Sequence, residues 1–301
     1  MSDHTTRRRR LAARALALVL GATGATLVAP TAPAAAAVPG LIRVAAVSAN
    51  NSTDFRSVTA TCPAGKVLTG TGYEINGATG EVVVDDLRPN GSAVSAPTAV
   101  TVGAYEADPF AGNWNVTAYA ICANPLPGLV RITAVSVNDS NPFHSATAAC
   151  PFGKVLTGTG FEMNGVTGEG VVDDLRPNGS TVSAPTAVTV GAYEADTFFG
   201  NWDVRAYAIC ANPVPGLIRV TTGSPRNSND SRFATTACAD GQVMTGAGFQ
   251  VNGALGEAVM DDFRPNGNAV SAPTAVTVGA YEEDPFAGTW NVQAYAICAT
   301  R

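Results

Sequence analysis

Histidine is almost absent from this chain of 301 residues, which contains two. Beyond residue 37 only His144 remains, and the repeats described below have Arg56 and Arg232 at the equivalent position. A single histidine at a position that varies supplies no Ser-His-Asp or Cys-His set, so a nucleophilic triad is excluded. The same scarcity argues against zinc, whose sites need clustered ligands.

Convincing helical periodicity and long apolar runs are also lacking beyond residue 37. No segment there is long enough to anchor the chain in a membrane. The Gly-x-Gly pattern in "TGTG" lies in a strand region without a following helix, which excludes a nucleotide-binding loop. The sequence therefore predicts no organic cofactor.

Basic residues are scarce once the N-terminal segment is set aside. Arg7–Arg10, an apolar run at Leu11–Val19 and small residues ending in Ala34–Ala37 predict that residues 1–37 are a cleaved export signal. The arginines also fit a twin-arginine signal, so the export route stays open. The segment holds five of the 18 Lys and Arg residues and one of the 24 Asp and Glu residues, which leaves 13 against 23, a net charge of −10. We therefore expect an acidic, extracellular protein. Its negative charge argues against nucleic acid and anionic membranes as partners.

Cysteine supports export. The chain has six, at Cys62 and Cys122, Cys150 and Cys210, and Cys238 and Cys298, so that each pair is separated by 60 residues. An even number at repeating spacing in an exported chain indicates disulfides. Pairing within each couple is the simplest of about 15 possible connectivities. Each bond is expected to stabilise its loop by about 4 kcal/mol.

The whole sequence beyond the signal is a threefold repeat. Shifting it by 88 residues aligns Trp114 with Trp202 and Trp290, and aligns the three "AYAIC" segments, without gaps. We therefore predict three modules, at residues 38–124, 125–212 and 213–301, joined by the short segments "ANPLPGL" and "ANPVPGL". Their length is that of a small self-contained domain.

Each module alternates with a period of two. In Ala99–Glu106 the residues Val100, Val102 and Ala104 share one face, while Thr101, Gly103 and Tyr105 share the other. In Trp114–Cys122 the face that begins with Trp114 is predicted to be core, and the face with Asn115 and Thr117 is predicted to lie in water. The other expected strands of the first module are Leu41–Val47, Arg56–Cys62, Val67–Ile75 and Glu81–Leu87.

These strands predict an all-β protein of three tandem, disulfide-stapled antiparallel sandwich or barrel modules. In each, the disulfide would join the second and last strands, and Trp114 would lie near it. The alternative is one pseudo-threefold, prism-like domain to which each module gives one sheet.

Two segments carry a resemblance to known proteins. The "CPAGKVLTGTG" and "CPFGKVLTGTG" segments, each followed by an Asp-Asp and Asn-Gly element, resemble repeats of vitelline membrane outer layer protein, a three-sheet β-prism, although the cysteine spacing here is longer. The modules are also similar to uncharacterised secreted bacterial proteins that have C-P-x-G-K and A-Y-A-I-C segments. The second resemblance implies export.

The segment "VDDLRPNG" occurs at Val84–Gly91 and Val172–Gly179, and as "MDDFRPNG" at Met260–Gly267. Pro-Asn-Gly favours a turn. Neighbouring strand residues point to opposite faces, so Asp85 and Asp86 would not converge on one bond of a substrate. One of them would pair with Arg88 or accept N–H groups of the turn. We favour this structural role over a calcium or ligand contact, and over catalysis.

A second set of acids follows the strand Ala99–Glu106. Glu106 and Asp108 are two residues apart, so on an extended chain their side chains would share a face at about 6–7 Å. That separation fits an inverting glycosidase or a hard cation such as calcium, whereas the alternative is solvated loop acids. Phe110 follows them, either as a sugar-binding aromatic or as a cover for the sheet edge. The candidate ligand-binding residues are Glu106, Asp108, Phe110, Glu194, Asp196, Phe198, Glu282, Asp284 and Phe286.

Triplication favours binding over catalysis, because linked weak sites gain avidity. We expect a secreted multivalent binding or adhesion protein for an extracellular glycan or cell-wall polymer. The alternatives are a structural coat or matrix protein and a carboxylate-dependent glycoside hydrolase. The oligomeric state stays open.

Overall fold

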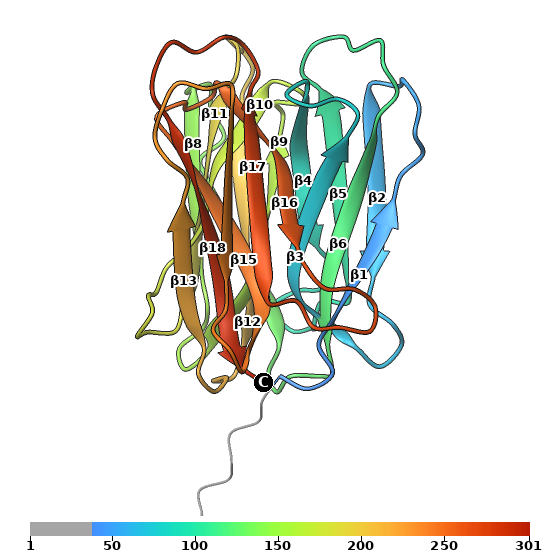
Figure 1. Ribbon diagram of the computed structural model, residues 1–301, viewed down its shortest axis with the longest axis vertical. Coiled ribbons are helices and arrows are strands. Elements are labelled where there is room, and N and C mark those ends of the chain that lie inside the picture. The colour runs from blue at the N-terminus through green and yellow to red at the C-terminus, as the bar shows by residue number, and fades with distance from the viewer. Residues whose placement is uncertain (1–37) are drawn as a thin grey trace, which may run out of the picture. The chain divides into compact units, whose positions relative to one another are not determined.

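The computed structural model describes residues 38–301, and its regular secondary structure consists of β-strands joined by turns (Figure 1). The predicted export signal lies outside the described residues. In the described part no helix is long and apolar enough to cross a bilayer. The predicted all-β fold with three disulfide-stapled repeats is confirmed.

Each repeat contributes six strands, and those of repeat 1 lie within two residues of the predicted bounds at either end. Repeat 1 has β1 (Ile42–Val47), β2 (Phe55–Thr61), β3 (Val67–Asn76), β4 (Val82–Pro89), β5 (Ala99–Glu106) and β6 (Asn115–Ala123). Repeat 2 has β7 (Val130–Val135), β8 (Phe143–Ala149), β9 (Val155–Asn164), β10 (Gly170–Pro177), β11 (Ala187–Glu194) and β12 (Asp203–Ala211). Repeat 3 has β13 (Ile218–Gly223), β14 (Ser231–Ala237), β15 (Gln242–Asn252), β16 (Ala258–Pro265), β17 (Ala275–Glu282) and β18 (Asn291–Thr300).

The strands form three antiparallel sheets of six strands, and every sheet draws three strands from each of two repeats (Figure 1). Sheet I has the order β1-β6-β3-β16-β17-β14, sheet II β2-β5-β4-β9-β12-β7, and sheet III β13-β18-β15-β10-β11-β8. Consequently no repeat supplies a sheet of its own, which the prism-like alternative had assumed. The described residues belong to one compact unit.

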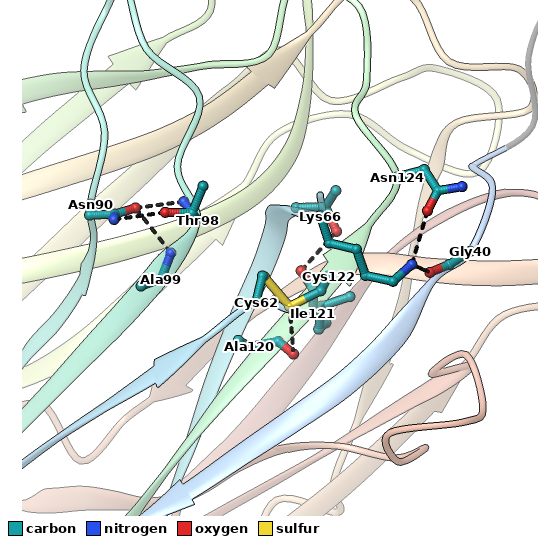
Figure 2. The surroundings of a disulfide bond; sticks show 11 residues. Gly40, Cys62, Lys66, Asn90, Thr98, Ala99, Ala120, Ile121, Cys122 and Asn124 are labelled. Atoms are coloured by element: carbon teal, nitrogen blue, oxygen red, sulfur yellow. Dashed lines mark hydrogen bonds between the residues drawn. A yellow bond between two sulfur atoms is a disulfide. The ribbon is translucent and has the colours of Figure 1, made fainter. Parts of the chain in front are cut away.

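The disulfide of each repeat joins its two sheets. Cys62 directly follows β2 of sheet II, and Cys122 lies in β6 of sheet I (Figure 2). The pairings are Cys62–Cys122, Cys150–Cys210 and Cys238–Cys298, as predicted. Trp114, however, precedes β6 and lies eight residues from Cys122, so about 26 Å of strand separates them and the expected packing of Trp114 near the disulfide is wrong.

The core follows the predicted alternation. Val100, Val102, Ala104 and Trp114 have no exposed surface. The expectation that the opposite face of the last strand lies in water is only partly right, because Thr117 is also buried. Thr117 lies across from Glu74 of β3, and its hydroxyl accepts a hydrogen bond from Asn76 Nδ2 at 3.4 Å.

The first glycine of "TGTG" in repeats 1 and 2, and of "TGAG" in repeat 3, lies where the repeats approach one another closely. A Cβ atom on Gly158 would lie 2.1 Å from the carbonyl oxygen of Thr69 in repeat 1. Gly70 and Gly246 meet Thr245 and Thr157 in the same way, at 2.3 and 2.2 Å. Only a residue without a side chain fits there. The glycines of the motif therefore serve contact between the three central strands, not a ligand.

The turn of "RPNG" is closed by its own asparagine. Asn90 Oδ1 accepts hydrogen bonds from the backbone N–H groups of Thr98, at 2.6 Å, and Ala99, at 3.0 Å (Figure 2). Gly91 follows with a φ of 91°, a left-handed conformation that favours glycine. The predicted turn chemistry is confirmed at this point of the motif.

Candidate functional site

The twin aspartates lie at a β-bulge. In β4 the register with β5 shifts between Val84 and Asp86, so Asp85 is an extra residue without a partner on β5. The same shift occurs in β10 and β16. A bulge breaks the alternation of side chains, so the argument that the two aspartates point to opposite faces of a regular strand does not apply. The first aspartate is buried and the second is half-buried.

Each buried aspartate reaches into the next repeat. Asp173 Oδ2 accepts a hydrogen bond from the N–H of Gly256, at 3.1 Å, and Asp261 Oδ2 accepts one from Gly80, at 2.9 Å. Asp85 bonds in the same way to Gly168. Repeat 1 thus binds repeat 2, repeat 2 binds repeat 3, and repeat 3 binds repeat 1. The contact closes a ring of three.

Burial gives these aspartates an unusual titration. Oδ1 of Asp85, Asp173 and Asp261 has no hydrogen-bond partner. Removal from water disfavours the charged carboxylate, and this raises the pKa of all three well above the ordinary value, while the bonds from the glycine N–H groups oppose the rise. The expected role of the turn's own N–H groups is therefore taken by those of a neighbouring repeat.

The rest of the motif also crosses to the next repeat. Arg88 pairs with Glu162 at 3.1 Å, and Arg264 pairs with Glu74 at 2.6 Å. The carbonyl oxygen of the proline accepts a hydrogen bond from a guanidinium, as Pro89 does from Arg131 at 2.9 Å. "DDLRPNG" is therefore a joint between repeats as well as a turn.

The predicted acid pair after β5 separates into two roles. Glu106 Oε1 accepts a hydrogen bond from Trp114 Nε1 at 2.8 Å, and its Oε2 accepts one from the N–H of Phe110 at 3.0 Å. Glu194 and Glu282 hold Trp202 and Trp290 in the same way, at 3.0 and 2.7 Å. Both oxygens of Glu106 are thus engaged inside their own repeat. The aspartates Asp108, Asp196 and Asp284 are exposed in the loops that follow.

Those loop aspartates act together on one residue. Burial, together with repulsion from Asp196, Asp108 and Asp284, raises the pKa of Glu283 to about 7. Acids from all three repeats therefore lie near one another at this end of the molecule. Within residues 38–301, no three His, Cys, Asp or Glu side chains are arranged to hold a metal ion.

The phenylalanines of the same loops are half-buried. Phe110, Phe198 and Phe286 pack against the core. Their rings also lie over a loop glycine: a Cβ on Gly112 would come within 2.4 Å of the ring of Phe110. This geometry agrees with the predicted alternative in which phenylalanine covers the sheet.

A buried arginine or histidine side chain lies on each core tryptophan, a contact that the sequence analysis did not predict. Arg56 lies over the ring of Trp114, at 4.9 Å from its centroid, and Arg232 lies over Trp290 at the same distance. In repeat 2 the imidazole of His144 takes this place, with its ring centroid 4.2 Å from that of Trp202. All three are buried. The histidine that stood out in the sequence thus replaces an arginine beside a core tryptophan.

Exposed aromatic pairs lie on the outward faces of the sheets, and sequence reasoning missed them. Phe55 of β2 and Tyr105 of β5 have ring centroids 4.5 Å apart, and Phe143 and Tyr193 are also 4.5 Å apart. In repeat 3 the phenylalanine has moved two residues along its strand, yet its ring still lies 5.5 Å from that of the equivalent tyrosine, in the pair Phe233–Tyr281. The three phenylalanines are 42%, 41% and 47% exposed. The alternation already placed Tyr105 opposite the core, which was the available signal.

Charged groups lie beside each aromatic pair. Asp85 and Asp86 raise the pKa of Tyr105 by repulsion, after burial. At the centre of sheet II, Asp86 lies directly across from Glu162, whose carboxylate accepts a hydrogen bond from Tyr207. The centre of each sheet is therefore polar next to an exposed apolar surface.

Comparison with protein-family models and with curated proteins finds no match to this chain.

Proposed function

We propose that this is a secreted, multivalent binding protein whose three outward sheet faces bind an extracellular glycan. The observation that carries the proposal is the Phe–Tyr pair on every sheet. In repeat 3 the phenylalanine stands two residues further along its strand. The exposed aromatic on that face is therefore supplied from a different position of the repeat. Burial in the core does not account for a ring that is 47% exposed, as Phe233 is.

Aromatic rings next to carboxylates and arginines suit a sugar. A pyranose offers an apolar face to a ring and hydroxyl groups to charged acceptors and donors. Tyr105 has Asp86 near it and Tyr193 has Asp174 near it. Three such faces on one rigid unit favour a polymer with repeating sugars, because simultaneous contacts raise the overall affinity.

Secretion belongs to the same proposal. The three disulfides are compatible with an oxidising compartment. The predicted export signal and the acidic mature chain support release to the exterior.

The loop acids support this proposal less than the sheet faces do. Glu106 already binds Trp114 and the loop backbone with both oxygens, so it is committed to holding the fold. The hydrolase alternative would need this carboxylate free to exchange protons with a substrate.

The test is pull-down on insoluble polysaccharides, with the Phe55→Ala, Phe143→Ala and Phe233→Ala changes made singly and together. We expect each single change to weaken binding several-fold and the triple change to abolish it, with the melting temperature within a few degrees of the wild type. The matched control is Phe152→Ala, at an aromatic that is fully exposed and present in one repeat alone. Undiminished binding by the triple variant would refute the proposal.

A further inference from the structure

The centres of the three sheets share one plan but differ in charge at a single position. Glu74 in sheet I and Glu162 in sheet II each pair with an arginine of the neighbouring repeat. Gln250 occupies the equivalent place in sheet III, across from Asp174. The arginine that would meet a glutamate there is Arg176. Within residues 38–301, no carboxylate oxygen lies within 4.0 Å of its guanidinium.

Arg176 lines a surface pocket together with a second arginine. This second arginine is Arg219, and the remaining walls are Thr189 and residues 177–179. Arg219 is held in place, because it donates to the carbonyl of Pro177 at 2.9 Å and lies over the ring of Tyr295 at 4.8 Å. Thr189 faces Arg176 across the two strands. A fixed guanidinium, an exposed one and a hydroxyl thus converge on one hollow.

The local balance of charge at this pocket is positive. In sheet I, Arg264 has carboxylate oxygens of both Glu74 and Asp262 within 4.0 Å, and Arg43 lies over the ring of Tyr119, whose hydroxyl donates to Glu74. In sheet III, Arg176 and Arg219 have one carboxylate near them, that of the half-buried Asp174. On a chain with 23 acidic against 13 basic residues beyond the signal, such a pocket attracts an anion where the rest of the surface repels it.

We infer that the pocket between Arg176 and Arg219 binds the carboxylate of an acidic sugar, so that the glycan bound by this protein is an acidic polysaccharide. The inference rests on the proposed function and names its ligand class. Guanidinium groups bind a planar carboxylate through paired hydrogen bonds. The threonine hydroxyl can accept or donate to a neighbouring sugar hydroxyl.

The pocket and the aromatic pair of sheet III can serve one chain of sugars. Thr189 and Tyr193 are four residues apart on the same face of β11, which corresponds to about 13 Å. Phe143 stacks on Tyr193. A polymer lying along β11 therefore places one sugar against the rings and another, further along, against the arginines.

The test measures binding of trigalacturonic acid, of its fully methyl-esterified form and of a sulfated galactose trisaccharide, by calorimetry on the disulfide-intact protein. We expect the free acid to bind at least ten-fold more tightly than the ester, with one acid-selective site per chain. Gln250→Glu should abolish that preference, because it gives Arg176 the partner that Arg88 and Arg264 have. Arg176→Gln should abolish it as well.

The matched gain-of-function variant is Glu74→Gln, which recreates the pattern of sheet III in sheet I. Gln250 accepts a hydrogen bond from Tyr295, so a glutamine at position 74 can keep the bond to Tyr119. We expect a second acid-selective site per chain. Equal binding of acid and ester by the wild type, or an acid preference unchanged in Gln250→Glu, would overturn the inference. If the sulfated sugar binds more tightly and depends on these variants in the same way, the pocket binds sulfate. That result would overturn the inference that it binds a sugar carboxylate.

Failure of this inference and failure of the proposed function give different results. If the three-phenylalanine variant loses polymer binding while Gln250→Glu does not change the preference for acid, the sheet faces bind glycan and the arginine pocket does not select it.

Discussion

The two acidic regions of each repeat hold different parts of the molecule together. Asp173 accepts its hydrogen bond from Gly256 of the next repeat, whereas Glu194, in the loop region, accepts its bonds from Trp202 and Phe198 of its own repeat. The sequence made the second region look like a binding site and the first look like a turn. The difference teaches that a motif repeated almost without change can mark a joint between repeats rather than a ligand site.

The largest expected effect comes from adding a side chain where two repeats are in close contact. Gly158→Ala would place a Cβ 2.1 Å from a backbone oxygen of repeat 1, so the central strands must separate. We expect a loss of about 3 kcal/mol or more in the free energy of unfolding. Chemical denaturation measures it.

The matched control is Gly223→Ala. A Cβ there meets its nearest atom at 3.5 Å, in ordinary contact, and the residue does not have a positive φ. Equal stability of the two alanine variants would contradict the close approach of the repeats.

A smaller effect is expected within a repeat. Glu194→Ala leaves the N–H of the buried Trp202 with the carbonyl of Asn141 as its remaining acceptor, and removes a bond to Phe198. We expect a loss of about 1–3 kcal/mol and a shift of the tryptophan fluorescence. Asp196→Ala, on an exposed side chain of the same loop, should stay within about 0.5 kcal/mol of the wild type. If Asp196→Ala were the more damaging change, the roles assigned to the two acids would be reversed.

The prediction with the clearest sign concerns the buried aspartates. Because burial raises the pKa of Asp173 in the folded protein, the folded state keeps a proton that the unfolded chain releases near pH 4. The free energy of unfolding should therefore fall as pH rises from about 4 through the folded pKa, by up to about 1.4 kcal/mol per pH unit for one titrating group.

Asp173→Asn should weaken this dependence without removing it, because Asp85 and Asp261 still titrate. Asp240→Asn, at an exposed residue after β14, should leave it unchanged. Unfolding by denaturant at several pH values between 4 and 8 measures both. A wild-type protein whose stability rises over this range would show that the aspartates are charged and well solvated.

The strands, the disulfides and the core tryptophans could be predicted because they depend on local pattern. Alternation sets which face of Ala99–Glu106 is buried, and regular cysteine spacing sets the pairing. The sharing of sheets could not be predicted, because strands β4 and β9 pair through Asp86 with Glu162 and Leu87 with Phe161 alone. Two residue pairs leave no periodic signal.

The sequence indicated which kinds of residue form the candidate site, acids and aromatics, but not where these residues lie in the fold. The bulge at Asp85 depends on a register shift against β5, which the sequence does not encode in any single residue. The edge-to-face contact of Phe233 with Tyr281 needs the pairing of β14 with β17 before two aromatics 48 residues apart can be seen as neighbours. By contrast, alternation within β5 was enough to place Tyr105 on the outward face.

The most direct test of contact between repeats is the solution state of one repeat. Residues 38–124, produced with the disulfide intact, lack the strands that pair with β3 and β4 and leave Leu87 and Tyr73 uncovered, since their partners Phe161 and Phe263 belong to the other repeats. Sedimentation velocity with circular dichroism should show either an unfolded monomer or a folded trimer that rebuilds the ring from three copies. A monomer that melts cooperatively, with near-ultraviolet dichroism like that of the whole protein, would contradict the claim that the three repeats form one interlocked fold.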